Sequence, residues 1–166
     1  MKKLFLVLTA ILVFTISSFC EASETSNAKY IHENYVKPSF SLLIEDFSPK
    51  IEEVLKNYST EYQDRAGGDL AYYYRPRFVE IKEKLANDKK AKNSHIKQLA
   101  EAVIQNEIEF IDTFVILRNK GSYNYDSFIA QGKKAILNLR NSVTQYKNEY
   151  ETITQEPLPK NNRLLP

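Results

Sequence analysis

A single carboxylate, Glu107, lies in the middle of an apolar helical pattern and is the first candidate for chemistry. A lone carboxylate is costly to bury, so it should be protonated, hydrated or paired with a cation. Helical-wheel positions place Arg77 and Arg140 at the edges of the apolar faces of two other predicted helices. The simplest interpretation is a structural ion pair between Glu107 and one of these arginines. The sharper hypothesis is a polar pocket inside a bundle, where an arginine binds a ligand carboxylate through two hydrogen bonds.

The second candidate is the run of three tyrosines and two arginines from Tyr72 to Arg77. Tyrosine and arginine are enriched among the residues that dominate binding energy at protein interfaces. Helical spacing places Tyr74 in the core and Tyr73 one turn before Arg77, and it directs Tyr72 to the far side together with Val79. This predicts a partner surface, or a glycan- or peptide-binding patch; the alternative is that tyrosines only cover one end of the fold. The candidate ligand or partner contacts are Tyr72, Tyr73, Arg75, Arg77 and Glu107.

Motifs for catalysis and for metal binding are missing from the sequence. His32 and His95 have no second metal ligand three or four residues away, and the Glu-x-x-His motif of di-iron bundles does not occur. There is no Gly-x-Ser-x-Gly nucleophile motif and no glycine-rich phosphate loop. Glu107 and Glu109 would point to different faces of a helix. We therefore expect no enzymatic activity, no cofactor and no metal.

The strongest helical pattern that could position these groups covers residues 96–117. Its apolar positions are Ile96, Leu99, Val103, Ile104, Ile108, Phe110, Ile111, Phe114, Val115 and Leu117. At about 100° per residue they cover roughly half of the helix circumference, which exceeds the stripe of an ordinary surface helix. Other helices should therefore cover this helix on two sides. Ser94 is a suitable N-cap, and Gly121 follows the predicted end.

A second apolar stripe begins at Phe40 and continues at steps of three and four residues to Tyr62. The stripe stays in phase across Pro49, which predicts one long helix kinked at this proline. The alternative is a helix that begins there, with Ser48 as N-cap.

Gly67-Gly68 is expected to end this first long helix, and Asp69 to cap the next one. Pro76 falls in the second turn of that next helix, which predicts either an irregular start or a regular helix that begins nearer Arg75. The polar run at residues 87–93 predicts a solvated loop before the central helix.

The last long helix should begin near residues 122–126 and end near Ile153. Gly132 lies inside its apolar stripe, where a missing side chain would let a neighbouring ring or helix come close. Nothing in the sequence is typical of a strand. The predicted fold class is therefore all-α, an antiparallel up-down bundle of about four helices.

The first 22 residues have the features of a secretory signal peptide, with two lysines, an apolar run and a small-residue ending at Ala22. The apolar run is shorter than the about 18–20 residues of a membrane anchor. Cleavage after Ala22 would remove the only cysteine, Cys20, so no disulfide could stabilise the exported protein. An uncleaved anchor and a lipid-modified Cys20 are the alternatives.

The charge balance argues against a nucleic-acid partner. The whole chain carries a net charge of +2, and losing two lysines and one glutamate with the signal peptide changes it to +1. A nearly neutral protein without a basic face lacks the electrostatic basis of nucleic-acid binding.

These features predict four parts: a signal peptide (1–22), an N-terminal arm (23–37) that is a short helix or loose, a helical-bundle domain (38–154) and a proline-rich disordered tail (155–166). We expect an exported, periplasmic or secreted, non-enzymatic binding protein of a bacterium, with an unknown protein or small ligand as partner. Membrane contact would be limited to the signal peptide before cleavage. The alternatives are a secreted effector or membrane-active helical protein, and a structural protein that assembles into homo-oligomers.

Overall fold

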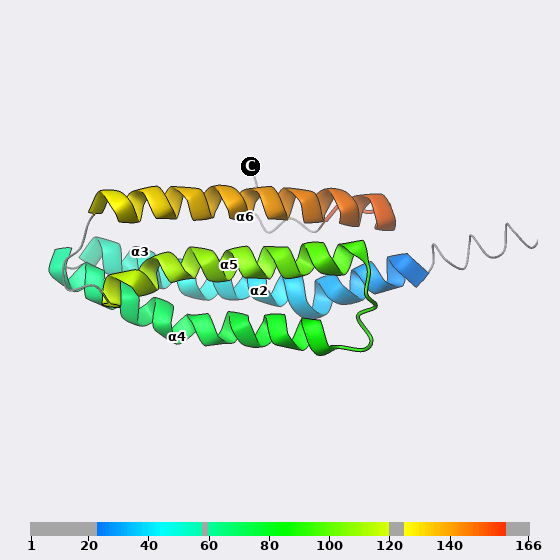
Figure 1. Cartoon of the computed structure of the whole chain (residues 1–166), viewed down its shortest axis with the longest axis horizontal. Coiled ribbons are helices and arrows are strands. Elements are labelled where there is room, and N and C mark those ends of the chain that lie inside the picture. Colours follow the sequence, from blue (N-terminus) through cyan, green and yellow to red (C-terminus); the bar gives the residue numbers. More distant parts are fainter. Residues whose placement is uncertain (1–22, 58–59, 120–124, 159–166) are drawn as a thin grey trace, which may run out of the picture.

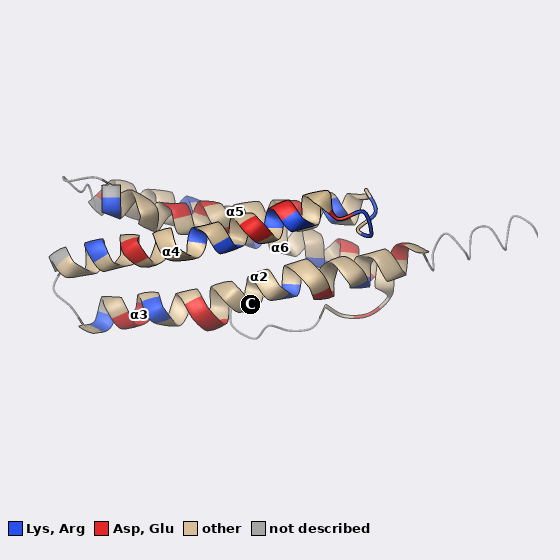
Figure 2. Cartoon of the chain, turned by 90° about the horizontal axis from the view of Figure 1, so that it is seen from below, with Lys and Arg blue, Asp and Glu red and all other residues tan. Residues whose placement is uncertain are grey.

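The computed structural model describes residues 23–57, 60–119 and 125–158. These residues form four long helical rods, and none of them is in a strand. Successive rods run in opposite directions along a common axis (Figure 1), as in an up-down bundle. In the view turned by 90° (Figure 2), α5 is drawn above α4, and the rod that contains α2 and α3 is drawn below it. The predicted all-α bundle of about four helices is therefore confirmed.

The first rod is one continuous helix that passes two prolines. It consists of residues 23–31, the π-helical turn His32–Val36 (η1), α2 (Lys37–Ser41), the π-helical turn Leu42–Phe47 (η2) and α3 (Ser48–Asn57).

The two π-helical turns carry the first rod through its prolines. A proline lacks the N–H that bonds four residues back, and its ring collides with the preceding turn of an α-helix. The residue just before each proline bonds five residues back instead, from the Lys37 N–H to the His32 carbonyl and from the Ser48 N–H to the Leu43 carbonyl. These wider turns leave room for the proline rings. The prediction of a single helix through Pro49 is confirmed, and the irregularity there is η2.

Residues 23–37, which were predicted to form a separate arm, are the first turns of this rod. Ala28, Ile31 and Val36 are fully buried and belong to the same core as the other helices. Polar residues surround these few apolar positions, so the stripe is difficult to recognise in the sequence. The bundle therefore begins well before residue 38.

α4 (Thr60–Asn87) runs through both features that were predicted to interrupt it. The prediction that Gly67-Gly68 ends a helix and that Asp69 caps the next was wrong, because both glycines lie inside α4. Pro76 also lies inside this helix, and the predicted irregular start is not observed. A Cβ added at Gly68 would lie 2.6 Å from the backbone nitrogen of Arg118 on α5. Gly68 is therefore required because two helix backbones approach closely at this point.

α5 (His95–Asn119) is the central helix of the bundle. It packs against α4 on one side and α6 on the other, which confirms the prediction for residues 96–117. Ser94 caps it as predicted, since its Oγ accepts a hydrogen bond from the Lys97 N–H at 3.4 Å. Asn27 of the first rod donates to the same oxygen at 3.1 Å. The start of α5 is thereby attached to the start of the first rod.

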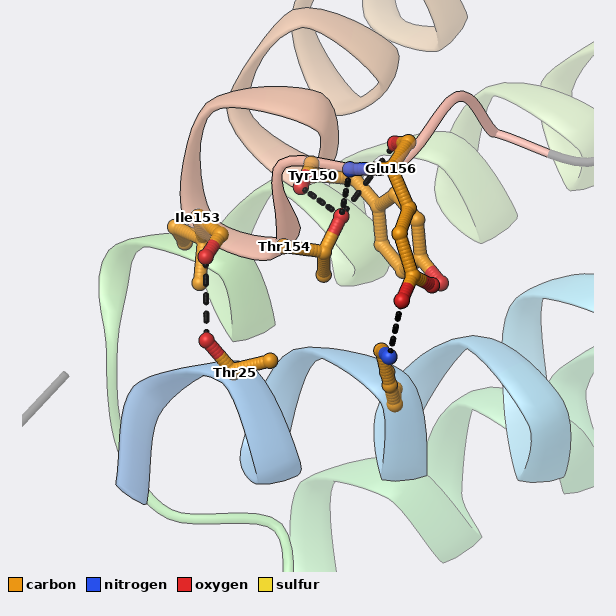
Figure 3. Close-up of polar contacts among 6 residues, drawn as sticks. Thr25, Tyr150, Ile153, Thr154 and Glu156 are labelled. Carbon is orange, nitrogen blue, oxygen red and sulfur yellow. Dashed lines mark hydrogen bonds and ion pairs between the residues drawn. The ribbon is translucent and has the colours of Figure 1, made fainter. Parts of the chain in front are cut away.

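α6 (Tyr125–Thr154) ends beside the first rod (Figure 3). Gln155 has a φ of 56°, the left-handed conformation that is common just after a helix. The Thr25 hydroxyl donates to the Ile153 carbonyl at 3.0 Å, and the Lys29 ammonium lies 2.7 Å from the Glu156 carboxylate. These contacts hold the beginning of the first rod and the end of α6 side by side.

Two predictions for the last part of the chain differ from the structure. A Cβ added at Gly132 would meet no described atom within 4 Å, so the predicted close approach at this glycine was wrong. Residues 155–158 are not a loose tail: Leu158 is buried, and its N–H donates to the Glu151 carboxylate at 3.0 Å. The predicted signal peptide (1–22), the predicted helix stop at Gly121 and the rest of the tail (159–166) lie outside the described residues.

Replacing Gly68 by alanine should destabilise the protein. Alanine is favoured over glycine in a helix by about 0.5–1 kcal/mol. The added methyl group would collide with the backbone of Arg118, however, and overpacking of this kind costs about 1–3 kcal/mol. We expect the free energy of unfolding to fall by about 1–2 kcal/mol in urea denaturation experiments.

Two other glycines of the chain supply matched controls. The methyl group of Gly67→Ala would lie 3.8 Å from the Leu117 side chain, an ordinary contact, and that of Gly132→Ala would enter open space. Both variants should be more stable than the wild type by about 0.5–1 kcal/mol. Equal losses in Gly67→Ala and Gly68→Ala would contradict a specific backbone approach at Gly68.

Candidate functional site

The carboxyl group of Glu107 lies in the interior of the bundle and has no exposed surface. Neither of its oxygens has a well-formed hydrogen bond among the described residues. The predicted ion pair with Arg77 or Arg140 was therefore wrong. Both arginines are exposed, and burying a guanidinium beside Glu107 would cost its hydration.

Burial also explains why Glu107 needs no cation. It raises the pKa of this carboxyl from 4.5 to about 8, and the neighbouring Ser39 hydroxyl of the first rod opposes part of the shift. That hydroxyl donates its hydrogen to the Val36 carbonyl at 2.9 Å. It therefore has no hydrogen left to donate to the Glu107 carboxyl and stabilises a negative charge there only weakly. Glu107 is therefore mostly a neutral carboxylic acid at pH 7 in the folded protein. A neutral acid is far less costly to bury than a carboxylate.

A second buried titratable group, His32, lies among aromatic rings of α6. Its Nδ1 is 3.4 Å from the Tyr146 hydroxyl, and its ring centroid is 5.1 Å from that of Tyr150. Its Nε2 has no partner among the described residues. Burial lowers the pKa of His32 from 6.5, so the ring is neutral at pH 7. No sequence pattern pointed to this position, because His32 belongs to the segment predicted as an arm.

Tyr72 of α4 and Arg118 of α5 form an exposed aromatic–cation pair. The Tyr72 side chain is 58% exposed, and the guanidinium carbon of Arg118 lies 4.2 Å from its ring centroid. Arg118 also pairs with Asp69 at 3.0 Å. The sequence analysis did not identify Arg118, because this residue belongs to α5. The spacing of residues within α4 cannot predict which side chain of another helix contacts Tyr72.

Tyr73 and Arg77 form a second pair of the same kind, one helical turn apart on α4. Tyr73 is 57% exposed, and the Arg77 guanidinium carbon lies 4.6 Å from its ring centroid. The Arg77 Nη2 donates to the Tyr73 hydroxyl at 2.6 Å. No carboxylate of the described residues forms an ion pair with Arg77. We name the exposed set Tyr72, Tyr73, Arg77 and Arg118 the tyrosine–arginine surface.

Arg75, the remaining candidate of this run, has a different role. Its Nε and Nη2 donate to the two carboxylate oxygens of Asp112 on α5, at 2.5 and 3.3 Å. This bidentate pair connects α4 to α5 and occupies the guanidinium. The structure therefore contains two exposed pairs of an α4 tyrosine with an arginine, Tyr72 with Arg118 and Tyr73 with Arg77. Arg75 is occupied by Asp112, and Glu107 lies in the interior.

The described part of the chain contains no cluster of three or more histidine, cysteine, aspartate or glutamate side chains that could hold a metal ion. Across residues 23–57, 60–119 and 125–158, no helix is both long and apolar enough to span a membrane. The chain matches no protein-family model, no curated protein and no solved structure. Its function must therefore be argued from the arrangement of its own residues.

Glu107 should make the protein less stable as the pH rises towards 8. A carboxyl with a higher pKa in the folded state retains a proton that the unfolded chain releases, so the free energy of unfolding falls between pH 4.5 and about 8. The slope should approach 1.4 kcal/mol per pH unit, roughly the value for one proton. His32 acts in the opposite direction below pH 6.5, because its pKa is lowered on folding. The clearest window for urea unfolding experiments is therefore pH 6.5 to about 8.

Glu107→Leu should remove this slope and should be at least as stable as the wild type at the upper end of the window. Leucine has a similar volume and no polar atom to bury. Glu109→Leu makes the same chemical change at an exposed position of α5 and should leave the slope in place. A slope that persists in Glu107→Leu would show that another group is responsible.

Proposed function

We propose that this chain is an exported, non-enzymatic binding protein of the bacterial cell envelope or medium, and that a protein partner docks on the tyrosine–arginine surface. The observation that carries the proposal is the exposure of two consecutive tyrosines on α4, Tyr72 and Tyr73. Each ring is more than half exposed, and a guanidinium group lies over each.

The chemistry of this surface favours a protein partner. Exposed tyrosine and arginine side chains supply large apolar area together with polar ends, the combination found at the energetic centres of interfaces. Stacking restrains the guanidinium groups of Arg77 and Arg118 before any partner arrives, so less conformational entropy is lost on binding.

Charge indicates which kind of protein surface would fit. Asp69 pairs with Arg118, but Arg77 has a hydroxyl and no carboxylate as partner among the described residues. An acidic group on the partner could pair with Arg77 through two hydrogen bonds. The complementary surface should therefore be acidic and should offer an apolar area for the two tyrosine rings.

Export is supported by the sequence of residues 1–22, whose lysines, apolar run and small-residue ending are typical of a signal peptide. The rest of the chain has no cysteine and depends on apolar burial for stability. The absence of a catalytic motif in the sequence supports binding over enzymatic activity.

Removing both tyrosine rings should strongly weaken binding of the partner. The mature protein would be immobilised, its partner would be captured from the envelope fraction and medium of its own host, and the affinity of the purified partner would be measured by calorimetry. Tyr72→Ala combined with Tyr73→Ala should cost about 2 kcal/mol or more, roughly a thirtyfold loss of affinity.

Leu137→Ala is the matched control, because Leu137 is also 58% exposed but lies on α6. It should leave the affinity unchanged. Equal losses in both variants would contradict the proposed surface. A protein that captures no partner but releases dye from liposomes would favour the membrane-active alternative, and a concentration-dependent oligomer that depends on Tyr72 would favour self-assembly.

The mature protein isolated from its host should begin at Ser23. Signal peptidase cleaves after a small residue at the end of an apolar run, and Ala22 is such a residue. Mass spectrometry of the intact protein from the envelope and medium would measure the N-terminus. A protein that retains residues 1–22 would contradict cleavage and would support an uncleaved anchor.

A further inference from the structure

A cavity of about 180 Å³ lies between α5, α6 and the first rod, apart from the tyrosine–arginine surface. Its lining residues are Leu43, Ser48, Phe110, Ile136, Leu139, Arg140 and Val143. Five of these seven side chains are purely apolar, so the cavity favours an apolar occupant. Glu107 does not line it, although Phe110 follows Glu107 by one helical turn.

The cavity exists because α6 packs mainly against α5 and only sparsely against the first rod. The contacts that join α6 to the first rod lie towards the end of α6, where Thr25 bonds to Ile153 and His32 approaches Tyr146. Nearer the start of α6, at Val143, Leu139 and Ile136, α6 and the first rod line the cavity instead of making such contacts. Ile136 is 40% exposed, so this side of the cavity is open to solvent.

Arg140 is the one charged side chain in the lining. It is exposed, and no carboxylate of the described residues forms an ion pair with it. The other polar lining residue, Ser48, donates its hydroxyl hydrogen to the Leu43 carbonyl at 2.8 Å and has only acceptor capacity left. An anionic group on a ligand would therefore be bound by Arg140.

We propose that this cavity binds a small hydrophobic carboxylate, with its apolar body among the leucine, isoleucine, valine and phenylalanine side chains and its carboxylate on Arg140. A dry protein cavity of about 150 Å³ accepts benzene, so about 180 Å³ accommodates a ring or a short branched chain. The planar guanidinium matches a carboxylate through two parallel hydrogen bonds. The arginine of the proposed pocket is thus Arg140, one of the two arginines considered from the sequence, and Glu107 does not line this cavity.

The test uses 4-phenylbutyrate as the probe and 4-phenyl-1-butanol as its neutral counterpart, with titration calorimetry on the full mature protein. The carboxylate should bind the wild type more tightly than the alcohol. Arg140→Gln should weaken binding of the carboxylate by about tenfold or more and leave binding of the alcohol unchanged, because only the charge-assisted hydrogen bonds are lost. Arg140 is exposed, so this variant should fold normally.

Three control variants distinguish binding in the cavity from binding elsewhere on the protein. Lys134→Gln removes one positive charge from another exposed position of α6 and should leave both affinities unchanged. Ile136→Trp should fill the open side of the cavity and abolish binding of both compounds. Tyr72→Ala combined with Tyr73→Ala should leave both affinities unchanged, so the outcome for the cavity is independent of the proposed protein partner.

Two results would overturn the proposal. The first is an absence of binding of 4-phenylbutyrate to the wild type, and the second is an equal loss of its affinity in Lys134→Gln and Arg140→Gln.

Discussion

The structure depends on covering the apolar circumference of α5. Ile96, Val103, Ile104, Ile108 and Ile111 are all buried, and they require neighbours on more than one side. α4 and α6 supply two of these neighbours, and the first rod supplies the interior surface between them. The ring of Phe47 on the first rod makes edge-to-face contacts with Phe110 and Phe114 of α5, at centroid distances of 6.5 and 5.7 Å. The described residues contain no cysteine, so apolar burial of this kind, and not a disulfide, holds these helices together.

The same constraint explains which parts of the fold could be predicted. The width of the α5 stripe and the Ser94 cap are local signals, and each leads to the observed element. The stripe from Phe40 to Tyr62 was wrongly assigned to one helix, because the first rod is described to Asn57 and Tyr62 belongs to α4. Glycine is ambiguous, because it occurs both after helix ends and where two helices approach closely. Gly67-Gly68 and Gly132 differ only in what lies opposite them, and that depends on a helix elsewhere in the chain.

The candidate site shows the same division between local and long-range information. The one-turn spacing of Tyr73 and Arg77 is a local signal, and the structure contains this contact. The burial of Glu107 also follows from the pattern around it. The lack of a cation beside Glu107 does not, since it depends on whether the surrounding helices can bring an arginine inward at a tolerable cost of desolvation. Arg118 over Tyr72 is a contact between helices that no spacing rule reveals.

The interior of the bundle is more polar than its helical stripes indicate. Glu107, Ser39 and His32 are buried in the region where the first rod faces α5 and α6. Both titratable groups are neutral at pH 7, because burial shifts their pKa values in the directions that disfavour charge. Burying these groups in neutral form avoids the desolvation cost of a buried charge, although the Glu107 oxygens and the His32 Nε2 have no hydrogen-bond partner among the described residues.

The contacts among Thr25, Ile153, Lys29 and Glu156 place both ends of the described fold at the same end of the bundle. A unit whose ends lie side by side can be inserted into a surface loop of another protein without separating the two halves of its host. For the same reason, a short linker between these ends would permit a circular permutation that opens the chain at another connection. The order of the four rods along the chain is thus less constrained than their packing, and the bundle is suited to use as a transferable module.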